Sequence, residues 1–310
     1  MDSRLRRRLA SLGMGVLRAV NARLGRTLGY EVRRARPASK AGKPSAGAPS
    51  KGKAVYSPPE PGVDRLLDRP VLVFAPVRSG STLLRLLLNG HSQLHAPHEL
   101  HIRRLEVHWS TRLAGRSMKE LGLDRGDLEH LLWDRVMHRE LVRSGKSFIV
   151  EKTPANAFAW RRLADCWPDA RFIFLIRHPV SIADSWHEAN PERRSPEEAG
   201  RDALSYMNAV EAARQGLAGH TVRYEDLTGD PATTLQGICA FLGLDWEPAM
   251  LDYGNHLSGE LSKGLGDWRS KVRSGTIQPS RALPRPEDIP GYLRSICDAW
   301  GYSGDSAAAM

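Results

Sequence analysis

The chain has 310 residues, of which 41% are hydrophobic and 26% charged, so it can form one large domain with a sizeable core or two small ones. Its formal net charge is +10, but residues 1–53 hold 14 Lys and Arg against two acidic residues, which leaves the rest of the chain nearly neutral. We therefore expect no nucleic acid partner for the body of the protein. The three cysteines, Cys166, Cys239 and Cys297, are far apart and match no metal-ligand spacing, so we expect no metal and a reducing, cytoplasmic location.

The first 69 residues differ in composition from the remainder. Over residues 1–35, Leu and Val recur every three or four positions among many arginines, which predicts a basic amphipathic helix. Such a helix is typical of proteins peripheral to an anionic membrane surface, and the pattern also fits a transit peptide or a helix that packs on protein. Residues 36–69 are rich in Pro, Ala, Gly, Ser and Lys and predict a flexible linker, so the main domain is expected at residues 70–304.

From Pro70 onward, short apolar runs alternate with helical periods, which predicts an α/β fold with a three-layer parallel sheet. The first run, Val71 to Ala75, has the length of a strand and leads into a tight turn over residues 76–82 that is rich in Gly, Ser and Thr. A leucine-rich helix follows and is expected to stop at Asn89-Gly90. This layout points backbone N–H groups at an anion, so we predict a P-loop-like phosphate-binding turn.

Further elements follow along the chain. A helix is expected from Asp127, as its N-cap, to Arg143, with Gly145 just beyond its end. Its apolar stripe is expected to be buried, so Trp133 fits the core as well as it fits a substrate-facing position. Three more strands are predicted at residues 148–150, 171–176 and 221–224.

The predicted strands share one feature, because each runs directly into polar or charged residues. In an open parallel sheet, ligands bind outside the carboxyl ends of the strands. An arginine at a strand end and a serine early in the next helix can converge on one phosphate, and Arg177 and Ser185 have this arrangement. The polar groups at the strand ends are Arg78 to Thr82, Lys152-Thr153, Arg177 and Tyr224-Glu225.

Five segments together resemble the sulfotransferases that use 3′-phosphoadenosine 5′-phosphosulfate (PAPS), and most closely the bacterial enzymes related to tyrosylprotein and heparan sulfotransferases. They span about residues 70–284 and read RSGSTLL, VEKTPANAF, IRHPVSIADSW, VRYEDLTGDPATTLQGICAFLGL and KGLGDWRSKV. The first segment lacks the first glycine and the lysine of the P-loop that binds nucleoside triphosphates, G-x-x-x-x-G-K-[ST].

The resemblance implies the site residues and the co-substrate, PAPS. It implies catalytic roles for Glu99, Arg78 and Lys152, with Glu99 as the base. It implies PAPS binding by Arg78, Ser79, Gly80, Ser81, Thr82, Arg177, Ser185, Tyr224 and Lys263. The histidines at positions 95, 98 and 101 remain alternatives for the base, because they also lie just beyond the leucine-rich helix that ends at Asn89-Gly90. Leu83 stands where cytosolic enzymes carry a tryptophan against adenine, so the adenine contacts are left open.

The expected function is sulfuryl transfer from PAPS to a hydroxyl acceptor by in-line displacement. Two other functions fit parts of the pattern: a P-loop kinase or NTPase, and a protein that binds anionic lipid or nucleic acid through its basic tail. The first lacks the P-loop lysine and a strand-end Asp for Mg²⁺, and the second predicts binding that depends on residues 1–53 and falls steeply with salt. The sequence leaves the acceptor open among sugars, lipids, peptides and small molecules.

Overall fold

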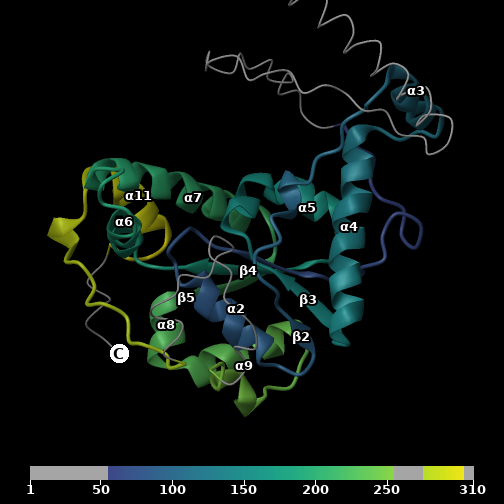
Figure 1. The fold of residues 1–310 in the computed structure, drawn as a ribbon. Helices are drawn as coiled ribbons and strands as arrows, with labels where there is room; N and C mark the ends of the chain where they lie inside the picture. The colour runs from purple at the N-terminus through teal and green to yellow at the C-terminus, as the bar shows by residue number, and fades with distance from the viewer. Residues whose placement is uncertain (1–54, 255–274, 304–310) are drawn as a thin grey trace, which may run out of the picture. The chain divides into compact units, whose positions relative to one another are not determined.

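A computed structural model describes residues 55–254 and 275–303 of the chain (Figure 1). At the centre of this described part lies a five-stranded sheet with the order β2-β3-β1-β4-β5. Every neighbouring pair is parallel, so the carboxyl ends of all the strands lie at one edge. The strands are β1 (Val71–Phe74), β2 (Leu94–His95), β3 (Phe148–Glu151), β4 (Arg171–Ile176) and β5 (Gly219–Arg223).

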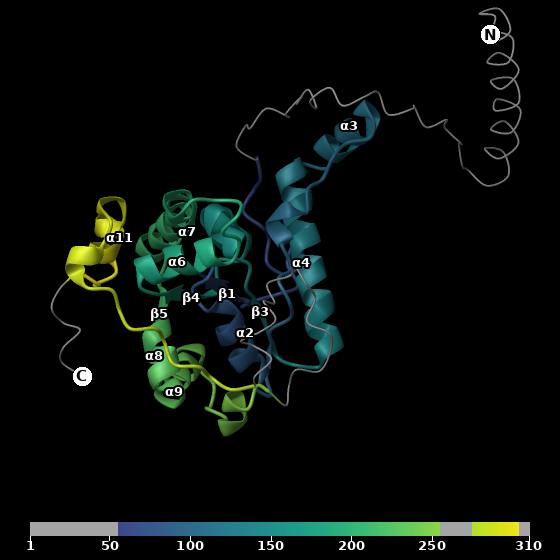
Figure 2. The ribbon, with the colours of Figure 1, turned by 60° about the vertical axis from the view of Figure 1, so that its left-hand side comes forward.

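Helices cover both faces of the sheet, as Figures 1 and 2 show from two directions. One face carries α4 (Arg125–Ser144), α5 (Trp160–Cys166), α6 (Pro179–Glu188), α7 (Pro196–Gly216) and α11 (Arg294–Ala299). The other carries α2 (Ser81–Asn89), α8 (Tyr224–Gly229) and α9 (Pro231–Leu242). The remaining elements are α3 (Arg112–Glu120) and the short 3₁₀ helices η1 (Ile102–Arg104), η2 (Pro154–Ala159), η3 (Pro248–Leu251), η4 (Pro286–Asp288) and η5 (Gly291–Leu293).

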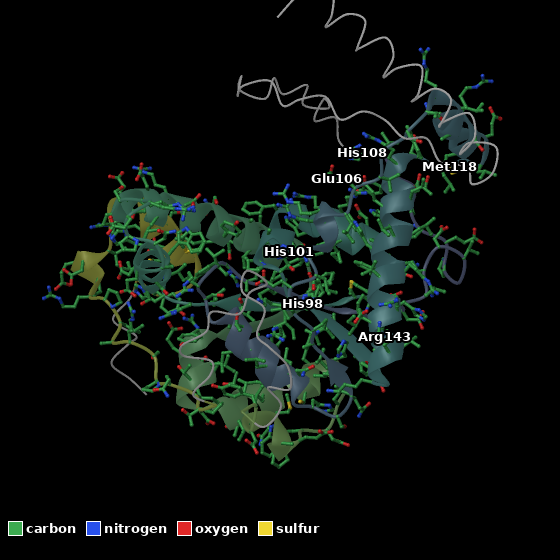
Figure 3. The ribbon with its side chains drawn as sticks, in the orientation of Figure 1. His98, His101, Glu106, His108, Met118 and Arg143 are labelled. Atoms are coloured by element: carbon green, nitrogen blue, oxygen red, sulfur yellow. The ribbon has the colours of Figure 1, made fainter. Side chains whose placement is uncertain are left out.

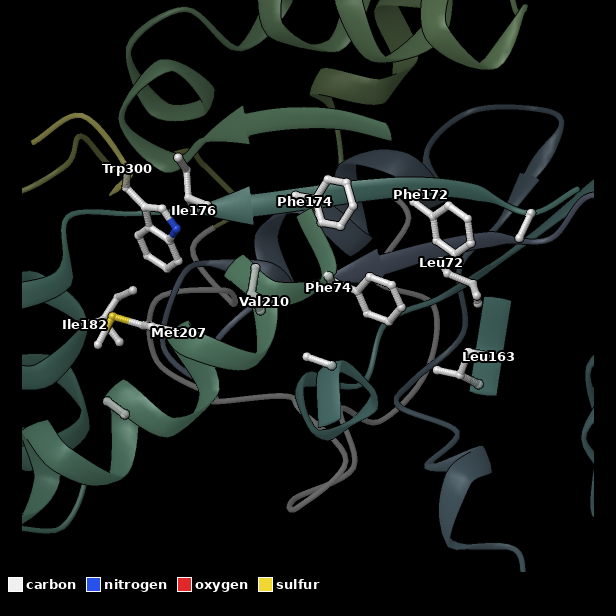
Figure 4. Packing of buried hydrophobic residues seen from close by; sticks show 14 of the residues in the cluster. Leu72, Phe74, Leu163, Phe172, Phe174, Ile176, Ile182, Met207, Val210 and Trp300 are labelled. Atoms are coloured by element: carbon white, nitrogen blue, oxygen red, sulfur yellow. The ribbon is translucent and has the colours of Figure 1, made fainter. Parts of the chain in front are cut away.

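The alternation of side chains along β1 explains the layers. Leu72 and Phe74 point to one face and belong to the cluster drawn in Figure 4, whereas Val71 and Val73 belong to a second cluster on the opposite face. Strands buried on both faces read as continuous apolar runs, and β4 is such a run. The prediction of a three-layer α/β fold with a parallel sheet is therefore confirmed.

The start of α4 differs from the prediction. Asp124 is the N-cap, and Asp127 is the third helical residue, whose carboxylate accepts the backbone N–H of Asp124 at 2.7 Å in a capping box. The sequence offers two aspartates three residues apart, and the capping box uses both, so the helix begins one turn earlier than expected. Its end is as predicted, because Gly145 has a left-handed φ of 69°. Trp133 is fully buried, which places it in the core.

Residues 55–69, within the segment expected to be a linker, pack on α4 and α5. The Tyr56 hydroxyl donates to Asp165 at 2.8 Å, and the N–H groups of Leu66 and Leu67 donate to the Asp134 carboxylate at 2.7 and 3.2 Å. Composition did not indicate these contacts, because their partners lie 67 to 109 residues away in the chain. The division of the chain at residues 35 and 69 stays a prediction.

Three sequence predictions lie outside the described residues: the amphipathic helix at residues 1–35, most of the linker, and Lys263. Binding to an anionic membrane surface depends on the first of these and also stays a prediction. Within residues 55–254 and 275–303, no helix is long and apolar enough to cross a membrane.

Candidate active site

The turn between β1 and α2 has an unusual backbone conformation. Arg78 has a positive φ of 62°, and Gly80, the N-cap of α2, has a φ of 91°. Only glycine fits the second position, because a Cβ atom there would overlap the ring of Tyr224. The Ser79 hydroxyl donates to the Pro76 carbonyl at 2.8 Å and so holds the turn closed. The turn therefore leads directly into the N-terminus of α2, where the first backbone N–H groups have no partner within the helix.

Three residues expected to bind phosphate meet beside this turn. The Arg78 Nε donates to the Ser185 hydroxyl at 3.1 Å, and the Arg177 Nη1 donates to the Arg78 carbonyl at 3.1 Å. The Arg177 guanidinium also lies over the Tyr224 ring, with its carbon 4.3 Å from the ring centroid. The structure thus brings together side chains from the ends of three strands, β1, β4 and β5, with Ser185 from α6.

The electrostatics of this group favour an anion. Burial lowers the pKa of Arg78, and the nearby charge of Arg177 lowers that pKa further. Burial also lowers the pKa of Arg177, whose side chain is 8% exposed. Its Nε is buried and has no hydrogen-bond partner among the described residues. A buried, unsatisfied donor on a cation is costly, and an anionic ligand would satisfy it.

A second charged group lies at the end of β3, on the other side of β1. The Lys152 ammonium donates to the Glu99 carboxylate at 2.5 Å, and both residues are buried, at 1% and 8% exposure. Burial lowers the pKa of Lys152, and the charge of Glu99 acts in the opposite direction. This close pair makes Glu99 a partnered, buried carboxylate, unlike a solvated loop residue.

The histidines near Glu99 differ in their contacts. The His101 Nε2 lies 3.4 Å from the Glu99 carboxylate, and the His98 ring contacts the Glu99 backbone carbonyl at 3.0 Å. Figure 3 shows both near the middle of the molecule, whereas Glu106 and His108 lie further toward α3. His95 lies in β2, paired with Ile149, and burial lowers its pKa.

Two site residues were missed by the sequence reasoning. Glu151 is fully buried and accepts from the Thr153 hydroxyl at 2.6 Å, the Asn156 amide at 2.9 Å and the Leu100 N–H at 3.4 Å, so it ties the loop after Glu99 to β3. Burial raises the pKa of Glu151. Arg281 is ion-paired with Glu188 on α6 and contributes positive charge at Arg78 and Arg177. Glu151 could have been suspected from its place beside Lys152, but nothing in the sequence singles out Arg281.

The described residues contain no group of three or more His, Cys, Asp or Glu that could hold a metal ion. The polar groups gathered at this edge of the sheet are two arginines, a lysine, a carboxylate and a helix N-terminus. These groups can hold an anionic nucleotide at one end and accept a proton at the other.

Comparison with known proteins gives a consistent result. A family model described as "Sulfotransferase family" matches residues 70–248. The chain is 27% identical over 203 residues to nodulation protein NoeE of Sinorhizobium fredii (strain NBRC 101917 / NGR234), covering 54% of this chain and 48% of that one. It is 26% identical over 235 residues to protein-tyrosine sulfotransferase 1 of Danio rerio, covering 68% and 62%. The chain thus spans about half to three-fifths of the length of these relatives.

Two solved structures share the fold. The sulfotransferase domain from the curacin biosynthetic pathway aligns with a TM-score of 0.56 at 21% identity, covering 76% of this chain and 98% of that domain. The sulfotransferase domain from the Synechococcus PCC 7002 olefin synthase aligns with a TM-score of 0.55 at 23% identity, covering 80% and 98%. At these identities, the two matches support the arrangement of the sheet and helices.

Proposed function

The chain belongs to the sulfotransferase family, and from this premise we propose that it transfers the sulfuryl group of PAPS to a hydroxyl acceptor. The observation that carries the proposal is that two groups of charged side chains lie at one edge of the sheet. One is the Arg78, Ser185 and Arg177 group with its unsatisfied Nε, and the other is the buried Lys152 and Glu99 pair. PAPS has an anionic group at each end of its ribose, and we assign the 3′-phosphate to Arg177 and Ser185 and the 5′-phosphosulfate to Arg78 and Lys152.

Arg177 and Ser185 bind the 3′-phosphate, together with Lys263, which stays a prediction from sequence. The backbone of the turn and the start of α2, from Ser79 to Thr82, bind the 5′-phosphosulfate with Arg78. Gly80 keeps the turn close to Tyr224, whose ring supports Arg177. Two observations support this assignment. The Arg177 Nε has no hydrogen-bond partner among the described residues, and position 80 has no room for a side chain.

Glu99 accepts the proton of the acceptor hydroxyl as its oxygen forms the new O–S bond. The S–O bond to the phosphate breaks, and adenosine 3′,5′-bisphosphate leaves with the electron pair. Lys152 and Arg78 stabilise the negative charge that develops on the departing phosphate oxygen. An ammonium group has three donors, so Lys152 can contact Glu99 and the leaving group together.

In this proposal the acceptor carries a hydroxyl group. The Danio rerio relative is named for protein tyrosine, so tyrosine peptides are the first acceptors to test, followed by sugars, lipids and small phenols. Incubation of the full chain with labelled PAPS and this panel should transfer label to at least one compound. A kinase or NTPase would instead hydrolyse ATP in the presence of Mg²⁺ and transfer no label from PAPS.

Nucleotide binding tests the assignment without an acceptor. Arg177→Ala should weaken the binding of adenosine 3′,5′-bisphosphate by about 10- to 100-fold, the effect of a charge-assisted hydrogen bond. The binding of adenosine 5′-phosphate should change little, because it lacks the 3′-phosphate. Calorimetry measures both affinities, and Arg171→Ala, at the other end of β4, is the matched control. Equal losses for the two nucleotides would remove Arg177 from the 3′-phosphate site.

A further inference from the structure

The residue that follows Arg177 connects the end of β4 to α8. The backbone N–H of His178, the N-cap of α6, donates to one oxygen of the Glu225 carboxylate at 3.1 Å. Glu225 follows Tyr224 at the start of α8, and the Tyr224 ring lies against the Arg177 guanidinium. The Glu225 carboxylate therefore joins the end of β4 to the start of α8, directly behind the proposed 3′-phosphate site.

The second oxygen of Glu225 is held from the C-terminal part of the chain. It accepts the Tyr302 hydroxyl at 2.6 Å. The Tyr302 ring makes an edge contact with the His178 ring, with centroids 5.0 Å apart, and lies against the Arg223 guanidinium at 4.7 Å. Tyr302 thus contacts the ends of β4 and β5 together, although it lies more than 75 residues beyond either in the sequence.

The turn that carries Tyr302 is firmly held. The Tyr302 N–H donates to the Cys297 carbonyl at 2.8 Å, and Arg223 donates to the Trp300 carbonyl at 2.7 Å. Gly301, which lies between Trp300 and Tyr302, has a left-handed φ of 72°. Trp300 is 2% exposed and packs in the same cluster as Ile176 at the end of β4 (Figure 4). The hydroxyl is therefore presented to Glu225 by an anchored segment.

This arrangement has an electrostatic consequence for Arg177. The negative charge of Glu225 acts on the Arg177 guanidinium. Both Glu225 oxygens are nevertheless occupied, one by the His178 N–H and one by the Tyr302 hydroxyl. Burial raises the pKa of Tyr302, so its hydroxyl stays protonated and remains a donor at neutral pH. With Glu225 held in this way, the Arg177 Nε has no acceptor among the described residues.

We infer that Tyr302 is a positioning residue for the nucleotide: it holds the Glu225 carboxylate away from Arg177 and so keeps the guanidinium available for the 3′-phosphate. The inference rests on the proposed function, in which Arg177 binds that phosphate. Without the hydroxyl, one Glu225 oxygen loses its donor and can turn to the guanidinium. The carboxylate then competes with the 3′-phosphate for the same cation.

The test compares two nucleotides on the full chain by calorimetry. Tyr302→Phe keeps the ring and its contacts but removes the hydroxyl. It should weaken the binding of adenosine 3′,5′-bisphosphate by about tenfold, the size of one hydrogen bond to a charged group. The binding of adenosine 5′-phosphate should stay within about twofold, because that ligand does not need Arg177. Tyr292→Phe is the matched control: it removes a hydroxyl in η5, and its ring contacts Arg201 instead.

A rescue variant separates positioning from packing. In Tyr302→Phe combined with Glu225→Gln, the amide oxygen can still accept the His178 N–H, but the competing charge is gone. The double variant should therefore bind the bisphosphate more tightly than Tyr302→Phe alone and approach the wild type. A merely structural role would predict no recovery, because the hydroxyl is absent from both variants.

The outcomes distinguish the inference from the function on which it rests. If the wild type does not prefer the bisphosphate to adenosine 5′-phosphate, the proposed function fails and the inference fails with it. If the wild type shows the preference and Tyr302→Phe keeps it, only the inference is overturned. A Tyr302→Phe chain that melts at a much lower temperature and loses both ligands alike would also overturn it, because the hydroxyl would then stabilise the fold alone.

Discussion

In the proposed mechanism, the Lys152 and Glu99 pair combines two tasks within one contact. The ammonium and the carboxylate lie 2.5 Å apart in a buried position at the end of β3. Burial of a carboxylate without a partner is costly, and the neighbouring ammonium supplies that partner. The ammonium can donate toward the leaving phosphate as well. The proposed proton acceptor and the proposed leaving-group donor are thus adjacent.

The proposed base can be tested by a change of one atom. Glu99→Gln keeps the size and polarity of the side chain but removes most of its basicity. We expect kcat to fall by roughly 10²–10⁴, because general-base catalysis is lost. The affinity for adenosine 3′,5′-bisphosphate should stay within about threefold, because Glu99 serves the acceptor side of the reaction. Initial rates with an acceptor found in the panel, and calorimetry with the bisphosphate, measure the two effects.

Glu106→Gln is the control for that variant, since Glu106 is exposed and its pairing with His108 is on the surface. The competing assignment is a histidine base. If Glu99→Gln turns over at the wild-type rate and His101→Ala or His98→Ala does not, the base is a histidine. The alignment of this chain with glutamate-dependent sulfotransferases would then be wrong at this loop.

At the scale of the elements, the sequence predicted those parts that depend on local pattern. The strand at Arg171–Ile176 has the predicted bounds, because the apolar run Phe172 to Ile176, rich in Phe and Ile, stands between turns. The turn before α2 was predicted from its Gly, Ser and Thr content, and its strand-turn-helix layout is present. The meeting of Arg78, Arg177 and Ser185 could also be expected, since parallel strands present their carboxyl ends at one edge.

The remainder depends on long-range partners that no local pattern reveals. The ion pair of Arg281 with Glu188 joins residues 93 positions apart, and the hydrogen bond of Tyr302 with Glu225 joins residues 77 positions apart. The strand at Gly219–Arg223 begins earlier than predicted because its glycine fits closely against Phe172 and Phe174 of β4. The direct contact of Lys152 with Glu99 was likewise absent from the prediction, which gave both residues catalytic roles without joining them.

Lys146 shows how one side chain joins three elements. It follows the end of α4, and its ammonium donates to the carbonyls of Asn89, His91 and Leu94 at 2.8 to 2.9 Å. These carbonyls belong to the end of α2, the turn that follows it and the start of β2. Carbonyl groups at a helix end lack partners within the helix, so the lysine acts as a C-terminal cap supplied from a distant segment. Burial lowers the pKa of Lys146.

Lys146→Met should therefore destabilise the protein while keeping the length of the side chain. The loss of a charged donor to several carbonyls should lower the free energy of unfolding by about 2 kcal/mol. Urea denaturation followed by circular dichroism measures the change, and Lys119→Met on the exposed face of α3 is the matched control. A midpoint equal to that of the wild type would mean that water satisfies these carbonyls as well as the lysine does.

At the scale of the whole molecule, one buried cluster joins α4 to α5. Arg162 pairs with Glu129 at 2.7 Å, lies over the Trp133 ring at 4.3 Å, and donates from its Nε to the His130 Nε2 at 3.0 Å. The His130 ring also contacts Tyr56, at 4.7 Å between centroids. A histidine nitrogen that accepts a hydrogen bond is not protonated, so this packing requires the neutral imidazole.

The cluster predicts how the stability of the protein depends on pH. Burial and the nearby charge of Arg162 together lower the pKa of His130 to about 4. An unfolded histidine has a pKa of about 6.5, so the unfolded chain binds the proton first as the pH falls. Below about pH 6.5 the unfolded state is therefore favoured progressively, until the folded protein also takes up the proton near pH 4. This histidine can lower the free energy of unfolding by at most about 1.4 kcal/mol for each pH unit in that window.

His130→Gln isolates this contribution, because the glutamine oxygen can accept from Arg162 but does not titrate in this range. We expect its free energy of unfolding to fall less steeply than that of the wild type between about pH 6.5 and pH 4. Three other histidines, His95, His178 and His220, also have a pKa lowered by burial, so both proteins should keep some slope. The difference between the two curves is the quantity to measure, by urea unfolding at several pH values.

His108→Gln on the surface should give the wild-type slope. Parallel curves for His130→Gln and the wild type would show that His130 does not couple proton binding to folding, and that the packing of α4 on α5 tolerates the charged ring.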